Sequence, residues 1–264
     1  MKSFRIKQME QYIMERRTVT MEELCQHFQV SMNTVRQDVA SLVEKGTVKK
    51  IYGGVTSVEK SPLLPFEQRR QRNADGKRAI GRLAAAFVED RDIIFLDSGT
   101  TTMHILEFIE PDKQVTMVTY SLIAINAAEA HSNVEVICLP GKLERMTRSF
   151  TSADTIKALE RLHINKSFMA TTGISATGDV TNSSLLEHDI KRAAVARSKK
   201  NYLLMDGYKF GRPSLVTYTD ISRMDGLITD EGPSADLTEL CRRKSVALWA
   251  ATPQESPQVL SENS

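Results

Sequence analysis

The 264-residue sequence has few cysteines and no long apolar run. Its three cysteines, Cys25, Cys138 and Cys241, lie far apart and form no C-x-x-C pair. A scattered, odd set excludes a disulfide framework and is typical of a reducing compartment, so we expect a cytoplasmic protein. The absence of a stretch of about 18 apolar residues excludes a membrane-spanning helix. The N-terminal residues are mixed and charged, unlike those of a secretory signal peptide.

The sequence also lacks the common catalytic and metal-binding motifs. Its five histidines have no metal-ligand spacing, and it contains neither a P-loop nor a nucleophile elbow. We therefore expect no metal, no cofactor and no catalytic residue. What is present is an ordinary globular composition, 41% hydrophobic and 26% charged, with a length that suits one small and one medium domain.

Charge is distributed unevenly along the chain, although the net charge is only +2. Residues 1–78 contain 15 Lys/Arg and 9 Asp/Glu, a balance of +6, whereas residues 79–264 contain 20 and 24, a balance of −4. A basic N-terminal part followed by a mildly acidic C-terminal part fits a phosphate-binding module joined to a domain with another role. Chance unevenness of surface charge is the alternative.

Three helices are predicted in the first 46 residues. The first spans about residues 4–17. The second begins at Thr20, whose hydroxyl forms a capping box with Glu23. The third spans about residues 31–45, with Ser31 as its N-cap and Gly46 as its end.

The third helix has a polar end suited to reading DNA. Val35, Val39 and Leu42 recur at helical spacing and should pack inward. The N-terminal end then exposes side chains that can bond to base edges or phosphates, as in a helix-turn-helix. Two β-prone runs around Gly53-Gly54 predict a hairpin, the wing. The predicted DNA-binding residues are Ser31, Met32, Asn33, Thr34, Arg36, Gln37, Lys49, Lys50 and Tyr52. A small helical bundle with no role in DNA binding is the alternative.

The stretch Val19 to Val39, together with Leu42, Gly46 and the Tyr52-Gly53-Gly54-Val55 run, resembles the DeoR family of transcription regulators. That family usually has two arginines before the Asp of its recognition helix, where this chain has Arg36 and Gln37, and it often has His at the position of Tyr52. These departures affect the operator preference that the resemblance implies and leave the expected fold unchanged.

A connector separates the two halves. Residues 57–65 contain two prolines, so we place a linker at residues 58–74, between a winged helix-turn-helix at 1–57 and a larger domain at 75–250. We expect the tail, residues 251–264, to be disordered. The basic segment with Arg69, Arg70 and Arg72 is either a solvated helix face or a DNA contact.

Beyond a helix at about residues 75–88, β-prone runs alternate with helical stretches. This alternation predicts an α/β domain with a mostly parallel sheet covered by helices, in which ligands bind at the carboxyl ends of the strands. The expected strands are 93–96, 115–119, 134–139, 166–171, 202–205, 227–229 and 246–249, and the expected helices are 101–109, 122–130, 155–162 and 187–196.

A hydroxyl-rich turn follows the first of these strands. Backbone N–H and hydroxyl groups at the start of a helix form a natural anion site, although a plain capped helix is the alternative. The residues of this turn are Asp97, Ser98, Gly99, Thr100, Thr101 and Thr102, where Asp97 could accept hydrogen bonds from sugar hydroxyls. Residues at other strand ends or helix starts should converge there, namely Gly173, Glu187, Lys191, Asp206 and Lys209. Glu187 and Lys191, four residues apart, could instead form a surface ion pair.

The C-terminal half also resembles the DeoR family, in its sugar-phosphate sensor domain. The resemblance covers roughly residues 3–250. It rests on the stretch from Arg69 to Lys77, the 96–102 run, Gly173-Ile174, Glu187 with Lys191, Asp206 with Lys209, and residues 226–230. It implies a fold similar to ribose-phosphate isomerases and CoA-transferases. It also implies a repressor of sugar uptake and catabolism genes that is released by a phosphorylated sugar. Tyr120 stands where the family usually has Asn, and Ala153 where a Gly is common.

We therefore predict a DNA-binding transcription regulator rather than an enzyme. Its expected partners are double-stranded operator DNA, a phosphorylated sugar and further copies of itself in a dimer or tetramer. An activator is compatible with the same residues. Two alternatives belong to other classes: a sugar-phosphate isomerase with an added helix-turn-helix, using Asp97, Glu187 and Lys209 for acid–base chemistry, and a protein-interaction adaptor.

Overall fold

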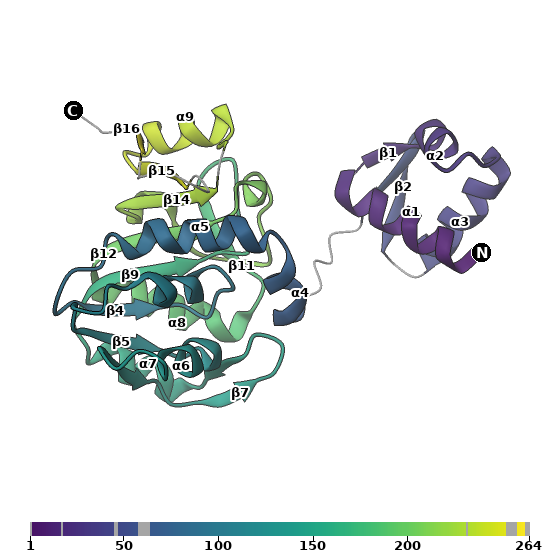
Figure 1. The fold of residues 1–264 in the computed structure, drawn as a ribbon. Coiled ribbons are helices and arrows are strands. Elements are labelled where there is room, and N and C mark those ends of the chain that lie inside the picture. Colours follow the sequence, from purple (N-terminus) through teal and green to yellow (C-terminus); the bar gives the residue numbers. More distant parts are fainter. Residues whose placement is uncertain are drawn as a thin grey trace. The chain divides into compact units, whose positions relative to one another are not determined.

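The chain divides into two compact units, Met1–Pro62 and Leu63–Ser264, shown in the computed structural model of Figure 1. The structure describes residues 2–16, 18–44, 47–57, 64–230, 232–251 and 258–261. The predicted helix end at Gly46, connector residues 58–63 and tail residues 252–257 and 262–264 lie outside these ranges. Within them, no helix is both long and apolar enough to cross a membrane.

The smaller unit packs its helices against a three-stranded antiparallel sheet of order β1-β3-β2. Its elements are α1 (Lys2–Arg16), β1 (Thr18–Thr20), α2 (Met21–Phe28), α3 (Met32–Glu44), β2 (Val48–Ile51) and β3 (Gly54–Ser57). Apolar side chains from every element form one core, in which Met9, Leu24 and Val39 are fully buried. The predicted helical periodicity therefore places these side chains inward.

Local signals explain how these elements begin and turn. Thr20 Oγ1 accepts from the backbone N–H of Glu23 (3.1 Å), and the Glu23 carboxylate accepts from the Thr20 N–H (2.7 Å), which completes the predicted capping box. Gln29 adopts a left-handed φ of 50° between α2 and α3. In the β2–β3 hairpin, a Cβ atom at Gly54 would collide with the carbonyl oxygen of Val19, so β1 approaches closely only because this residue is Gly.

The larger unit is built on an eight-stranded sheet of order β16-β15-β14-β12-β9-β4-β5-β6, parallel except for β16. Its sheet strands are β4 (Ile93–Leu96), β5 (Val115–Thr119), β6 (Val134–Cys138), β9 (Ile164–Ala170), β12 (Ser198–Met205), β14 (Gly226–Asp230), β15 (Ala247–Ala251) and β16 (Gln258–Ser261). The predicted strands all fall in this sheet, which confirms the α/β fold with a mostly parallel sheet.

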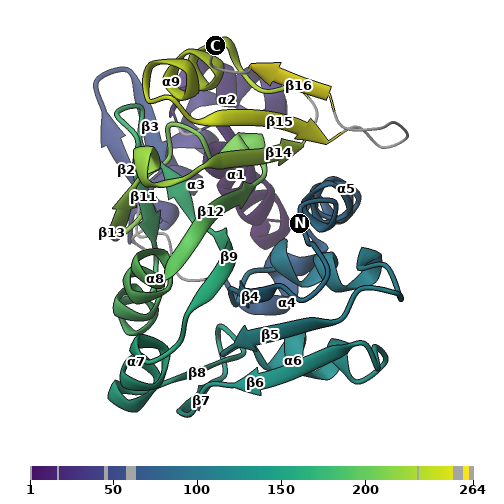
Figure 2. The ribbon, with the colours of Figure 1, turned by 90° about the vertical axis from the view of Figure 1, so that its left-hand side faces the viewer.

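Helices cover both faces of this sheet (Figure 2). They are α4 (Phe66–Gln71), α5 (Ala74–Ala85), α6 (Leu122–Ala128), α7 (Ala153–Glu160), α8 (Leu185–Arg197) and α9 (Ala235–Arg243), with 3₁₀ turns η1 (Thr102–Phe108), η2 (Gly207–Lys209) and η3 (Ile221–Arg223). Leu83 of α5 and Ala124 of α6 pack in one core, whereas Leu159 of α7 and Ile190 of α8 pack in the other. Both faces are apolar because a parallel sheet is buried on both sides.

Several elements differ from the sequence predictions. The predicted linker 58–74 contains α4, which belongs to the larger unit because Phe66 is buried and its N–H donates to the Met146 carbonyl (3.1 Å). The predicted disordered tail contributes β16, which pairs with β15. The helix expected at 101–109 is the 3₁₀ helix η1. Two small antiparallel sheets were not predicted: β7 (Lys142–Glu144) with β8 (Ser149–Thr151), and β10 (Gly173–Ile174), β11 (Asp179–Asn182) and β13 (Val216–Asp220).

Candidate DNA-reading surface and ligand site

The N-terminal end of α3 presents an exposed polar surface. Asn33, Arg36 and Gln37 are exposed, Met32 and Thr34 are half-buried, and within the described part of the chain the guanidinium of Arg36 has no ion pair. Ser31 is exposed and its Oγ accepts from the Thr34 N–H at 3.3 Å. Lys49, Lys50 and Tyr52 are exposed on the β2–β3 hairpin. Ser31 and Thr34 bond to each other, whereas the exposed side chains of Asn33, Arg36 and Gln37 are accessible to base edges and phosphates.

An ion pair between a buried carboxylate and a partly exposed arginine joins this helix to α1. The Asp38 carboxylate is fully buried on the inner face of α3 and accepts from Arg5 Nε of α1 at 2.7 Å. This hydrogen bond raises the pKa of Arg5. Asp38 was not predicted to be a buried residue, although it lies between Val35 and Val39 on the face that helical periodicity turns inward.

In the larger unit, predicted ligand residues gather at the carboxyl edge of the sheet around Asp97. Asp97 directly follows β4, and its carboxylate is already saturated by four donors. Oδ1 accepts from Tyr120 Oη (2.6 Å) and the Ser98 N–H (2.9 Å), and Oδ2 accepts from the Ala170 N–H (2.7 Å) and Lys191 Nζ. Burial, followed by the charge of Asp97, raises the pKa of Tyr120 well above its ordinary value. Asp97 thus ties β4, β5, β9 and α8 together.

Glu187 and Lys191 are buried side chains and do not form the surface ion pair considered as an alternative. Lys191 Nζ pairs with Asp97 and also donates to the Ala170 carbonyl at 3.1 Å. The Glu187 carboxylate accepts from Ser98 Oγ (2.7 Å), Ser149 Oγ (2.8 Å) and Asn182 Nδ2 (3.3 Å). Both side chains point inward because α8 packs this face against β9 and β11 rather than toward solvent.

The turn after β4 keeps two hydroxyl groups unpaired. Thr102 Oγ1 donates to the Asp97 carbonyl (2.7 Å), so this hydroxyl is used internally. Thr100 and Thr101 are both buried, yet among the described residues their hydroxyls make no hydrogen bond. A Cβ atom at Gly99 would collide with the Ala170 side chain, so the turn packs tightly on the end of β9.

A second cluster lies where β12 and β14 end. Asp206 follows β12, and its Oδ2 lies 3.3 Å from Lys209 Nζ but makes no hydrogen bond within the described chain. Asn73 Nδ2 bridges Asp206 Oδ1 (2.9 Å) and Asp230 Oδ2 (2.8 Å). Gly173 packs beside Arg212 and the Lys209 backbone, where no Cβ atom would fit.

Lys77 adds a buried positive charge to this second cluster. It is 1% exposed, and its Nζ donates to the carbonyl oxygens of Arg69 and, at 2.5 Å, Arg72. Burial lowers the pKa of Lys77 to about 8; Asp206 opposes this shift, and the nearby cations Lys209, Arg69 and Arg72 add to it. The cations Lys77, Lys209, Arg69 and Arg72 lie close enough to affect one another's charge, while Asp206 and Asp230 are the carboxylates bridged by Asn73. A concentration of positive charge of this kind favours a bound anion.

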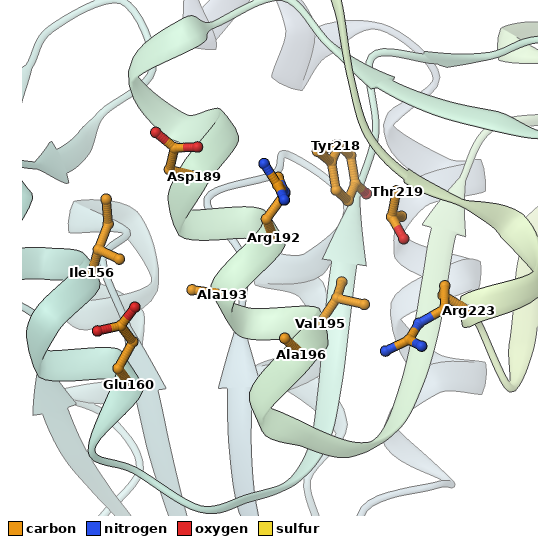
Figure 3. A pocket seen from close by; sticks show the side chains of 10 residues that line it. All are labelled: Ile156, Glu160, Asp189, Arg192, Ala193, Val195, Ala196, Tyr218, Thr219 and Arg223. Carbon is orange, nitrogen blue, oxygen red and sulfur yellow. The ribbon is translucent and has the colours of Figure 1, made fainter.

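A separate open cavity of about 620 Å³ lies against α7 and α8 (Figure 3). Arg192 and Asp189 line it from α8, and Tyr218 lines it from β13. Tyr218 also contacts the ligand cluster, because its Oη donates to the Ala170 carbonyl (3.0 Å) and its ring centroid lies 5.3 Å from Lys191 Nζ. None of the predicted ligand residues lines this cavity. Within the described ranges, no group of His, Cys, Asp or Glu side chains could hold a metal ion.

Comparison with known families decides the identity of both units. Residues 5–61 match the DeoR-like helix-turn-helix domain, and residues 72–231 match the DeoR C-terminal sensor domain. The chain belongs to the DeoR family. It is a DNA-binding transcription regulator of that family.

The relatives of this DeoR-family regulator span almost its whole length. It is 44% identical to the HTH-type transcriptional regulator IolR of Bacillus subtilis, over 95% of this chain and all of that protein. It is 30% identical to an L-fucose operon activator of Haemophilus influenzae, over 89% of this chain and 95% of that protein. It is 29% identical to a lactose phosphotransferase system repressor of Streptococcus mutans, over 87% of this chain and 92% of that protein. Among solved structures, ribose 5-phosphate isomerase A from Methanocaldococcus jannaschii matches at 14% identity with a TM-score of 0.39, covering 52% of this chain and 55% of that one.

The structure of this DeoR-family chain adds site residues that the sequence analysis did not assign. They are Arg69, Asn73, Lys77, Ser149 and Asn182. The stretch from Arg69 to Lys77 contributes to the family resemblance, and Lys77 also lies three residues before Ile80 on the inward face of α5. Ser149 and Asn182 lie in the short strands β8 and β11, where periodicity gives little information on direction.

Proposed function

We propose that this regulator is a repressor of carbohydrate uptake or catabolism genes whose operator binding is weakened by a phosphorylated sugar. In this proposal the α3 residues 31–37 and the hairpin residues 49–52 bind the operator as a dimer or tetramer. The sugar phosphate binds at the carboxyl edge of the large sheet, at residues 98–102, Gly173, Glu187, Lys191, Asp206 and Lys209. Asp97, which was predicted to accept from sugar hydroxyls, instead supports this turn because its carboxylate is already saturated. Operator binding is assigned to residues 1–57 and binding of the sugar phosphate to residues 75–250. The helix α4 lies just before the second of these ranges and packs with it.

The observation that carries the ligand proposal is the unpaired hydroxyls of Thr100 and Thr101 on the same sheet edge as four cationic side chains. A phosphoryl group accepts hydrogen bonds from both hydroxyls and backbone N–H groups, and its charge is stabilised by Lys77 and Lys209. The carboxylates of Glu187 and Asp206 retain lone pairs that sugar hydroxyls can meet. Relatives named for fucose and lactose systems support a carbohydrate ligand.

A gel shift on the DNA upstream of the protein's own gene tests this function. The full chain should bind that DNA, and one or more of a panel of pentose and hexose phosphates should release it. The matching free sugars and inorganic phosphate serve as controls for the two halves of the ligand. Lys209→Ala should bind the operator normally and lose the response to the ligand. Failure of every phosphate to bind or alter the complex would rule out the proposed effector class.

The isomerase alternative predicts turnover of the same phosphates by the purified chain. The Asp97 geometry argues against it, because both oxygens of its carboxylate already accept two hydrogen bonds each and leave no lone pair for a substrate proton. We expect no conversion of ribose 5-phosphate when the reaction is followed by nuclear magnetic resonance.

A further inference from the structure

Arg69 on α4 has a buried donor that no group in the described structure accepts. Its Nε donates to the Leu64 carbonyl (3.0 Å), and its guanidinium stacks over the Phe66 ring at 5.5 Å. Its Nη2, however, is buried and has no hydrogen-bond partner among the described residues. A buried, unpaired donor lowers the stability of the fold, and a charged donor lowers it more, so such donors are rare unless a ligand satisfies them.

The surroundings of Arg69 belong to the proposed ligand site. The charges that act on it most strongly are those of Glu187 and Asp97, which oppose the lowering of the Arg69 pKa by burial. Both carboxylates have other donors: Asp97 is saturated, and Glu187 is held by Ser98, Ser149 and Asn182. The guanidinium therefore lies in the negative field of these groups without bonding to either.

The segment that carries Arg69 is fastened to the same site. Lys77 Nζ donates to the carbonyls of Arg69 and Arg72, and the Arg72 guanidinium lies 4.1 Å from the centroid of the Tyr208 ring. Asn73, at the start of α5, bridges Asp206 and Asp230. The Arg72 and Asn73 contacts join the 66–73 segment to residues at the ends of β12 and β14, and the Lys77 contacts join it to α5.

We infer that Arg69 is a ligand-binding residue, whose Nη2 donates to an oxygen atom of the bound sugar phosphate, and that the ligand thereby stabilises α4. This inference rests on the proposed function and names a residue that the function did not require. Because α4 is the first helix after connector residues 58–63, ligand contact with Arg69 acts on the segment through which the chain reaches the winged helix.

Neighbouring arginines on one helix allow a matched test in the full chain. Arg69→Gln removes the charged donor, whereas Arg70→Gln makes the same change at an exposed side chain paired with Glu67 (3.1 Å). Calorimetric titration would use the phosphate from the gel-shift panel that the wild-type chain binds best. Arg69→Gln should weaken that binding at least about tenfold, because a hydrogen bond to a charged group is lost, and Arg70→Gln should leave it within about twofold.

Hydrogen exchange of residues 64–73 provides a readout besides affinity. The phosphate should slow exchange of these amides in the wild-type chain and in Arg70→Gln, and not in Arg69→Gln. Arg69→Lys keeps the charge without the planar fork and should bind with intermediate affinity, which covers the case in which Arg69→Gln fails to fold.

Three results would overturn the inference in distinguishable ways. Unchanged ligand affinity and unchanged protection of residues 64–73 in Arg69→Gln would reject Arg69 as a ligand residue and leave the proposed function standing. Unchanged ligand affinity with weaker operator binding in the absence of ligand would assign Arg69 to DNA instead. Absence of binding of any panel compound by the wild-type chain would overturn both the proposed function and this inference.

Discussion

At the scale of single residues, Arg36 is an exposed cation with no hydrogen bond or ion pair among the described residues. It lies on the N-terminal part of α3, directly after the buried Val35, and its side chain leaves the helix on the exposed side. We expect Arg36→Ala to weaken operator binding by about 1–3 kcal/mol, because an arginine contact to a base or phosphate is lost. Fluorescence anisotropy with the labelled operator would measure this loss.

Lys7→Ala is a suitable control for the Arg36 substitution, since Lys7 is an exposed cation on α1. It should change operator affinity much less. Equal losses in the two variants would mean that Arg36 contributes only to the general positive charge of the unit. The circular dichroism of both variants should match the wild-type spectrum.

The buried Asp97–Lys191 pair yields a prediction about stability. Both side chains are almost completely buried, so removing one partner leaves an uncompensated charge. We expect Lys191→Met to lower the free energy of unfolding of the larger unit by about 3–5 kcal/mol. The single tryptophan, Trp249, lies in β15 and therefore reports urea unfolding of this unit by fluorescence.

Adding Asp97→Asn to Lys191→Met should restore part of that loss, because the double variant no longer buries an unpaired carboxylate. A loss below about 1 kcal/mol in Lys191→Met would show that Tyr120, Ser98 and Ala170 alone satisfy Asp97.

Residue identities at the ligand site were predictable only where a motif marked them. The run 97–102 and the pairs Glu187/Lys191 and Asp206/Lys209 follow strands or open helices, which the sequence pattern reveals. Their assignment to a ligand remains a prediction. The role of Tyr120 was not predictable, because its hydroxyl bonds to Asp97 across 23 positions of sequence.

At the scale of elements, the α4–α5 junction depends on a lysine with a shifted pKa. The pKa of Lys77 is lowered from 10.5 to about 8 in the folded chain. Between these values the unfolded chain binds the proton more tightly, so the free energy of unfolding rises as pH increases through this range. Below pH 8 the cost of burying the charge is fully present.

We expect the wild-type chain to gain about 2 kcal/mol of stability relative to Lys77→Met between about pH 7 and about pH 9.5. Urea unfolding of both proteins, followed by Trp249 fluorescence at each pH, would measure the difference. The comparison cancels the titration of other lysines and tyrosines. A difference that does not change with pH would mean that Lys77 keeps its ordinary pKa.

Element types were predicted best for the central strands. Runs such as Ile93–Leu96 are short, apolar and flanked by turns, as expected for strands buried on both faces. The segment 66–71 is placed in a linker because it follows the two prolines of the connector. The burial of Phe66 and the hydrogen bond from its N–H to the Met146 carbonyl show that it packs on the larger unit. The strand β10 has only two residues, and β11 (Asp179–Asn182) has a single apolar residue, Val180, so neither gives the apolar run that marks β4.

At the scale of the whole molecule, the proposed function requires that operator and effector affect each other's binding equally. If a sugar phosphate weakens operator binding by some factor, the operator must weaken phosphate binding by the same factor. We expect a factor of about 5–150, the usual range for coupling of 1–3 kcal/mol. Calorimetric titration of the phosphate into the free chain and into its operator complex would measure it.

Equal phosphate affinities of the free and operator-bound chain would contradict the proposed coupling, even if both ligands bind. If the operator-bound chain binds the sugar phosphate more tightly than the free chain does, the phosphate strengthens operator binding instead of weakening it.

The sequence by itself determined the two-unit organisation, the helix-turn-helix with its capping box and hairpin, and the parallel sheet. These depend on local periodicity and turn chemistry, which act over a few residues. Only the tertiary structure decided that the Asp97 carboxylate has all its hydrogen bonds filled and that Arg69 keeps an unpaired donor. It also decided that Glu187 and Lys191 are buried and bond to different partners instead of to each other. Those properties arise where strands and loops distant in sequence meet at one edge of the sheet, and hydrogen-bond satisfaction there depends on every neighbour at once.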